Sequence, residues 1–138
     1  MKNLLFIILI LLFATSFSFA QAQAPQKKGE RIEALKIEFV LKKLELNEED
    51  AKSFAFMYKS YLQEVNLLLR QKKEAREINK NNPQKLVDDD FYYDEKMFQL
   101  KKQYRRRFQQ VLSPEQIKTL YIAEREFREE LIKHLKSK

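Results

Sequence analysis

The sequence feature with the clearest binding chemistry is a run of positive charge. Five bases fall within seven residues and surround a single tyrosine, Tyr104. Such a cluster attracts carboxylates, acidic protein segments or anionic lipid head groups. The alternative is an ordinary solvated helix face with Tyr104 turned toward a core. The basic cluster consists of Lys101, Lys102, Arg105, Arg106 and Arg107.

Aromatic residues form a second candidate binding pattern. Residues 91–93 read Phe-Tyr-Tyr, and Tyr58 and Tyr61 precede them in the chain. Tyrosine offers a partner apolar area and a polar tip at low entropic cost. Tyr92 is the best surface candidate, because Tyr93 falls on a predicted buried line. The alternative for these rings is packing in a core or a dimer interface. The candidate protein-binding tyrosines are Tyr58, Tyr61 and Tyr92.

Acidic residues do not form a convincing catalytic or metal site. Asp88, Asp89 and Asp90 offer oxygen ligands, with Asp94 and Glu95 nearby. Consecutive side chains on a helix point in different directions, so a first turn that complements the helix dipole is the better interpretation. The chain has one histidine and no cysteine. We therefore predict no enzyme activity, no cofactor and no metal site.

Length and composition limit the fold class. The 138 residues suit one domain, 44% are hydrophobic, and the formal net charge is +7. One glycine and three prolines exclude glycine-rich phosphate loops and turn-dense β-sandwiches. No disulfide is available. These numbers favour a basic helical protein.

The first residues have the pattern of an export signal. Lys2 precedes an unbroken apolar run at residues 4–14, and small residues follow, with A-x-A-like sites that end at Ala20, Ala22 and Ala24. We predict a secretory signal peptide at 1–24 and a flexible lead-in at 25–29. The alternative is an uncleaved N-terminal anchor. Because an exported protein does not meet nucleic acid, we expect none as a partner.

The rest of the chain, residues 30–138, predicts one all-α domain of four helices. Apolar residues recur at the helical period of 3.6 along each segment. We expect a shorter N-terminal helix and a long antiparallel central hairpin. The expected helices are 30–44, a long one from Asn47 to between Arg76 and Asn79, one that begins between Pro83 and Asp90, and 114–135.

Two of these helices begin with the same kind of sequence. Asn47 is the expected N-cap of the long helix, with Asp50 as a weak capping-box partner. Ser113 and Gln116 form the expected capping box of the last helix, with Pro114 in its first turn. A leucine precedes each cap. The structural motif residues are Leu46, Asn47, Asp50, Leu112, Ser113 and Gln116.

The paired motif resembles the Spy/CpxP family of periplasmic proteins, which carries two Leu-Thr-x-x-Gln motifs at helix starts. Here the copies read Leu-Asn-Glu-Glu-Asp at 46–50 and Leu-Ser-Pro-Glu-Gln at 112–116. Residues 31–39 and 120–128 are similar to a branch labelled as sensors of extracytoplasmic-function sigma factors. The resemblance implies an all-α fold with a long antiparallel hairpin, often in a cradle-shaped dimer.

The same resemblance implies a function. It suggests a periplasmic, ATP-independent chaperone or envelope-stress adaptor that binds unfolded or specific envelope proteins. Metal-sensing relatives use His, Met and acidic ligands, and this chain departs from them with His134 as its only histidine. Two alternatives stay open: a signalling modulator of one membrane sensor or anti-sigma system, and a cationic binder of anionic membrane surfaces.

Overall fold

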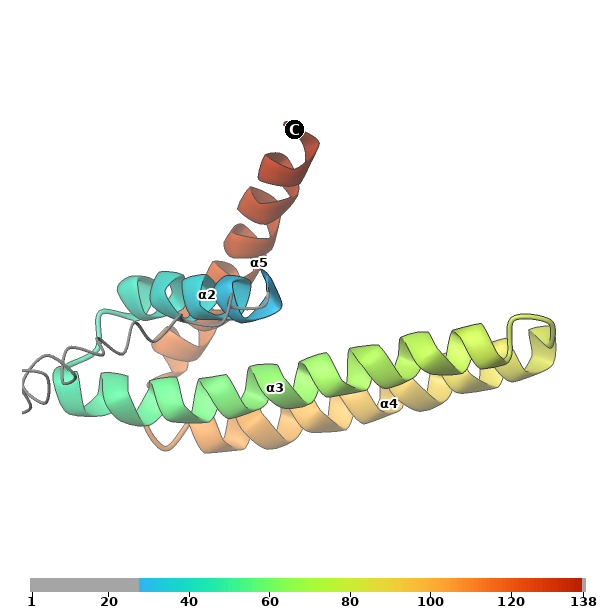
Figure 1. Cartoon of the computed structure of the whole chain (residues 1–138). Coiled ribbons are helices and arrows are strands. Elements are labelled where there is room, and N and C mark those ends of the chain that lie inside the picture. Colours follow the sequence, from blue (N-terminus) through green and yellow to red (C-terminus); the bar gives the residue numbers. More distant parts are fainter. Residues whose placement is uncertain (1–27, 138) are drawn as a thin grey trace, which may run out of the picture.

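The computed structural model describes residues 28–137, and this part of the chain is entirely helical outside its connections (Figure 1). The prediction of an all-α protein with four helices is confirmed for these residues. The predicted signal peptide lies outside them, as does most of the lead-in. Lys28 and Gly29, assigned to that lead-in, instead begin the first helix. The helices are α2 (Lys28–Leu44), α3 (Glu48–Ile78), α4 (Pro83–Phe108) and α5 (Pro114–Lys136).

The two longest helices, α3 and α4, lie side by side and run in opposite directions (Figure 1). Tyr61 contacts Tyr104 near one end, and Lys72 contacts Asp94 farther along. The 31 residues of α3 extend about 46 Å at 1.5 Å each. We call the end that meets α2 and α5 the base of the α3/α4 pair. The opposite end, at residues 79–82, is its tip.

The hydrophobic core lies at the base. Phe54 is fully buried, and its ring centroid lies 5.2 Å from that of Tyr58 and 5.3 Å from that of Phe108. The first pair is stacked and the second is tilted, and both arrangements add to the free energy of apolar burial. The aromatic core comprises Phe54, Tyr58, Tyr61, Tyr104 and Phe108. Aliphatic residues complete it: Val40, Leu44, Leu62, Leu100, Leu112, Ile117, Leu120 and Ala123.

The joint between α2 and α3 has the predicted cap. The Asn47 side chain accepts a hydrogen bond of 2.9 Å from the backbone N–H of Asp50. Asp50 does not reach back to the backbone as in a full capping box; its carboxylate accepts from the Asn47 side-chain amide at 2.6 Å. Leu46 is half-buried against the core. Glu45 adopts a left-handed conformation with φ of 49°, which ends α2.

The joint between α4 and α5 has a complete capping box. The Ser113 hydroxyl accepts from the backbone N–H of Gln116, and the Gln116 side chain accepts from the backbone N–H of Ser113. Leu112 is buried beside this cap. The repeated motif therefore fixes the starts of the two helices, α3 and α5, that pack at the base.

Not every residue on an apolar stripe is buried. Leu35 on α2 and Leu135 on α5 lie on the stripes of their helices, yet both are more than half exposed. The last turns of α5 extend away from the other helices (Figure 1), so Leu135 has nothing to pack against. α2 covers α3 and α5 with one side only, through Val40 and Leu44. Leu35 lies outside that contact.

Candidate functional site

The basic cluster lies on the outer face of α4, as its sequence predicts. Tyr104 turns into the core, and its neighbours Lys101, Lys102, Arg105 and Arg106 are exposed. Arg107 is half-buried, and its guanidinium lies 4.6 Å from the centroid of the Tyr104 ring. Within residues 28–137, no carboxylate lies within salt-bridge distance of any member of the cluster. These charges are therefore available to a partner.

The charge along α4 is divided by sign. Residues 83–95 contain five carboxylates and one lysine, whereas residues 96–108 contain six bases and no acid. Arg105, Arg106 and Arg107 lie in the last turn of α4, where the helix dipole favours positive charge. The basic half of α4 is thus stable as a helix without local acidic partners. No acid lies within residues 96–108 to reduce the positive field of this half.

The aromatic candidates separate into two groups. Tyr58 and Tyr61 are buried in the aromatic core, so the prediction that they form an exposed binding surface is wrong. Their spacing places them on the face of α3 that meets α4 and α2. Tyr92 is 55% exposed on α4 and remains a candidate. Its neighbour Tyr93 is half-buried, as predicted, and the two rings meet edge-on at 5.1 Å.

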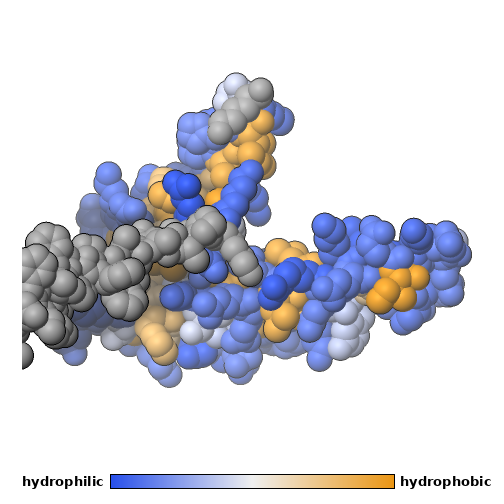
Figure 2. All heavy atoms as spheres, viewed as in Figure 1, coloured by the Kyte–Doolittle hydropathy of each residue, from blue (hydrophilic) through white to orange (hydrophobic). Residues whose placement is uncertain are grey.

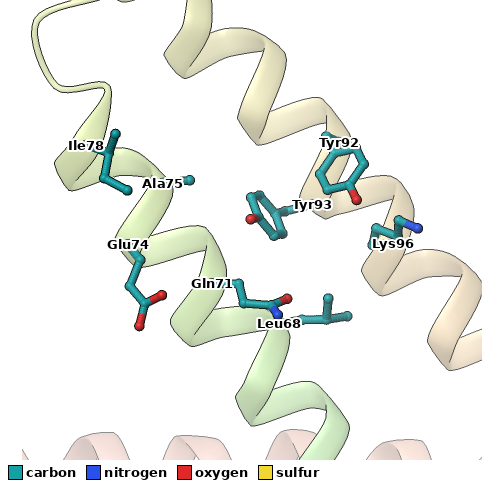
Figure 3. Close-up of a pocket in the computed structure, with 8 residues that line it drawn as sticks. All are labelled: Leu68, Gln71, Glu74, Ala75, Ile78, Tyr92, Tyr93 and Lys96. Atoms are coloured by element: carbon teal, nitrogen blue, oxygen red, sulfur yellow. The ribbon is translucent and has the colours of Figure 1, made fainter.

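Tyr92 lines a hollow between α3 and α4, in the half of the pair that extends toward the tip (Figure 3). The hollow has a volume of about 420 Å³. Tyr93 points into the gap between the helices opposite Ala75, whose small side chain leaves the space open (Figure 3). The Lys96 ammonium lies 5.4 Å from the centroid of the Tyr92 ring. The lining residues are Leu68, Gln71, Glu74, Ala75, Ile78, Tyr92, Tyr93 and Lys96.

Two further aromatic residues extend this surface along α4. Phe91 and Phe98 are both largely exposed, and the Lys102 ammonium lies 5.9 Å from the Phe98 ring centroid. Phe98 and Lys96 are not among the binding residues that the sequence predicts. The sequence could have indicated that the two phenylalanines are exposed. Phe91 and Phe98 are seven residues apart and lie off the buried line of Leu100 and Tyr104. Apolar patches show in orange between blue charged residues (Figure 2).

The acidic run of α4 forms ion pairs with α3. Asp88, Asp89 and Asp90 do not lie in a first helical turn, because α4 begins at Pro83 with Asn82 as its cap. That prediction is wrong. The Arg76 guanidinium donates to both oxygens of Asp90 at 2.9 and 3.1 Å. The ion-pair ladder between α3 and α4 consists of Lys72 with Asp90 and Asp94, and Arg76 with Asp90, whereas Lys85 pairs with Asp89 within α4.

These ion pairs change the pKa values of the carboxyl groups. The hydrogen bonds from Arg76 hold the pKa of Asp90 below its usual value, and those from Lys85 do the same for Asp89. Asn79 also donates to Asp89, at 2.7 Å. The acidic run therefore fixes the register of the two helices. Within residues 28–137, no group of three or more His, Cys, Asp or Glu side chains is arranged to hold a metal ion.

A buried polar network joins three helices at the base. The Tyr58 hydroxyl donates to the carboxylate of Glu124 at 2.9 Å, and the Lys36 ammonium lies 3.5 Å from the same oxygen. Burial raises the pKa of Tyr58 far above its usual value, and the negative charge of Glu124 acts in the same direction. Tyr58 therefore remains a neutral donor. The network ties α2, α3 and α5 together, so we assign it a structural role.

Comparisons with models of protein families, with curated proteins and with solved structures found no match. In the part of the chain that the structure describes, no helix is both long and apolar enough to cross a membrane.

Proposed function

We propose that this protein is an exported, ATP-independent chaperone or envelope-stress adaptor that binds unfolded or partner proteins along α4. One observation carries the proposal: exposed aromatic rings lie beside cations that have no carboxylate partner among residues 28–137. An unfolded protein presents both apolar side chains and carboxylates. The exposed face of α4 offers aromatic rings to the apolar side chains and cations to the carboxylates.

The mechanism follows from the ranges of the two forces. The positive field of residues 96–108 acts over roughly 10 Å at moderate salt and speeds encounter with acidic partners. Phe91, Tyr92 and Phe98 then make short-range apolar contacts. Because these rings lie on an open helix face, they hold a partner loosely. Release needs no nucleotide.

The sequence resemblance supplies the cellular setting of the proposal. We infer that residues 1–24 direct export to the periplasm, and that the α3/α4 pair corresponds to the central hairpin of a Spy/CpxP-like architecture. A homodimer of the kind that the resemblance implies is part of this proposal.

The first test is aggregation of an unfolding client protein, followed by light scattering without ATP. We expect suppression near an equimolar ratio that weakens as salt is added. Two unrelated clients separate general binding from a chance affinity. No suppression of either client at several-fold excess would contradict the chaperone proposal. Capture of one dominant envelope protein, without any effect on aggregation, would favour the signalling alternative instead.

A charge-reversal variant tests whether the α4 surface does the binding. We expect Lys101→Glu with Lys102→Glu and Arg106→Glu to lower suppression several-fold. The matched control is Lys59→Glu, Lys73→Glu and Lys80→Glu. These lysines are exposed and have no salt-bridge partner within residues 28–137, so the control changes the net charge equally on α3 and the tip. Equal losses in both variants would show that only net charge matters.

A further inference from the structure

The first half of α5 has an apolar hollow that the α4 surface does not include. Six residues on one face of the helix line it, and its volume is about 550 Å³. Ile117 is buried, Ile122 is half-buried, and Tyr121 is 42% exposed, so apolar groups form the floor. The lining residues are Pro114, Ile117, Lys118, Tyr121, Ile122 and Arg125.

Cations border this floor. Lys118 and Arg125 are exposed, and among residues 28–137 no carboxylate lies within salt-bridge distance of either. Arg105 of α4 lies close enough to Tyr121 to oppose the rise in the pKa of that phenol, which burial and Glu124 cause. Glu124 itself is occupied by Tyr58 and Lys36. The hollow therefore combines an apolar floor with a rim of positive charge.

We propose that this hollow along α5 is a second protein-binding subsite, and that it selects segments in which an apolar side chain lies beside carboxylates. Charge complementarity with Lys118 and Arg125 identifies the partner. The inference rests on the proposed function, because it names the kind of segment that the chaperone or adaptor holds best.

The dimensions of the hollow favour a protein segment over a membrane. Residues 114–125 extend about 16 Å along α5, which is the length of about five residues of extended chain. A membrane would require a broader positive face, and beyond Arg125 the bases Arg128 and Lys133 are balanced by Glu129 and Glu130, of which Glu130 pairs with Lys133. A short segment avoids these two carboxylates.

Short labelled peptides test the selectivity directly. Each peptide carries Leu-Phe at its centre, flanked by two Asp, two Asn or two Lys residues, and binding to the full protein is followed by fluorescence anisotropy. We expect the Asp-flanked peptide to bind about tenfold more tightly than the Asn-flanked one, and the Lys-flanked peptide to bind most weakly. Equal binding of the three peptides would overturn the subsite.

Variants on the same helix locate the binding. We expect Lys118→Glu with Arg125→Glu to weaken binding of the Asp-flanked peptide about tenfold. The control is Arg128→Glu with Lys136→Glu, which makes the same charge change on exposed α5 residues outside the hollow. For the floor, Tyr121→Ser is compared with Ile132→Ser, because these residues are 42% and 44% exposed. Equal effects of variant and control would overturn the location.

Two further outcomes separate the inference from the proposed function. If the parent protein suppresses aggregation but does not distinguish the peptides, the subsite is wrong and the proposed function stands. If it binds the Asp-flanked peptide at the hollow but suppresses no client, the proposed function is wrong and the subsite stands. If vesicles of anionic lipid bind with the same dependence on Lys118 and Arg125 while the peptides do not bind, the hollow is a membrane-surface site and the proposed peptide subsite is wrong.

Discussion

At its base the α3/α4 pair packs aromatic rings against one another, whereas toward its tip the same two helices are joined by ion pairs. Phe54 and Phe108 are buried at the base, and their contact excludes water. Arg76 and Asp90, near the tip, remain partly exposed. Buried apolar area contributes much more to the free energy of folding than exposed ion pairs do. The base therefore contributes most of the stability of the fold, whereas the ion-pair ladder fixes the register of α3 against α4.

This difference bears on binding. Local opening occurs where few apolar groups are buried. The hollow beside Tyr92 lies in the half of the pair that the ladder holds, so its two walls are joined by contacts that salt weakens. We expect the width of the hollow to vary more than the spacing of the helices at the base. The base, which carries the network of Tyr58 and Glu124, keeps its shape.

Removal of a ring from the base has the largest expected effect. Phe54 is fully buried, and Phe54→Ala should lower the free energy of unfolding by about 3–5 kcal/mol in a urea melt. The matched control lies two residues away: Phe56 is 74% exposed, and Phe56→Ala should change stability by less than about 0.5 kcal/mol. Similar losses in the two variants would contradict the placement of the core.

Loss of a helix cap should lower the free energy of unfolding by less than loss of the Phe54 ring does. A cap at the base should matter more than a cap at the tip. Ser113→Ala removes the hydroxyl that accepts from Gln116 and should cost about 1 kcal/mol in a urea melt. Asn82 caps α4 at the tip in the same way, at 3.1 Å from the backbone N of Lys85. We expect Asn82→Ala to cost less, because the tip can fray without opening the core. A change in Ser113→Ala that cannot be told from zero would contradict the role of the cap.

The ladder should have the smallest effect on global stability and a clear dependence on pH. The pKa of Asp90 is lowered in the folded protein by its hydrogen bonds with Arg76, so its carboxylate stabilises the fold above the unfolded value of about 3.9. This contribution disappears as pH falls through the folded pKa, which is lower. Asp90→Asn should therefore differ from the parent at neutral pH and match it in strong acid.

Hydrogen exchange distinguishes the two regions in the same variant. We expect amides of 72–79 to exchange faster in Asp90→Asn, with no change in 54–62. Asp88→Asn is the control, because Asp88 accepts from Gln84 on its own helix and forms no ion pair among residues 28–137. Faster exchange along the whole of α3 would show that the ladder and the core open together.

Sequence alone predicts most of the fold because local signals decide it. The caps at Asn47 and Ser113 depend on residues three positions away, and both are present as predicted. The helical period also places Tyr104 and Phe108 in the core. The same period also places Leu135 on the apolar stripe of α5, although this residue is exposed. The spacing of apolar residues along one helix does not indicate where the helix packed against it ends.

The candidate site is less predictable, because exposure depends on contacts between helices. Tyr58, Tyr61 and Tyr92 have the same chemistry in the sequence. The structure buries the first two where three helices meet and leaves Tyr92 more than half exposed beside the hollow between α3 and α4. The acidic run is similar: its partners Lys72 and Arg76 are 14 to 22 residues away in the sequence. Only the antiparallel register brings them together.

The division of charge along α4 has a consequence for how the molecule approaches a partner. One half of a 26-residue helix is negative and the other is positive, so an external field exerts a torque as well as a pull. A negatively charged surface or protein therefore turns the molecule before contact, so that residues 96–108 face it first. Orientation is thus selected during diffusion, and the Phe98 ring, which lies beside Lys102, reaches the partner ahead of the acidic end.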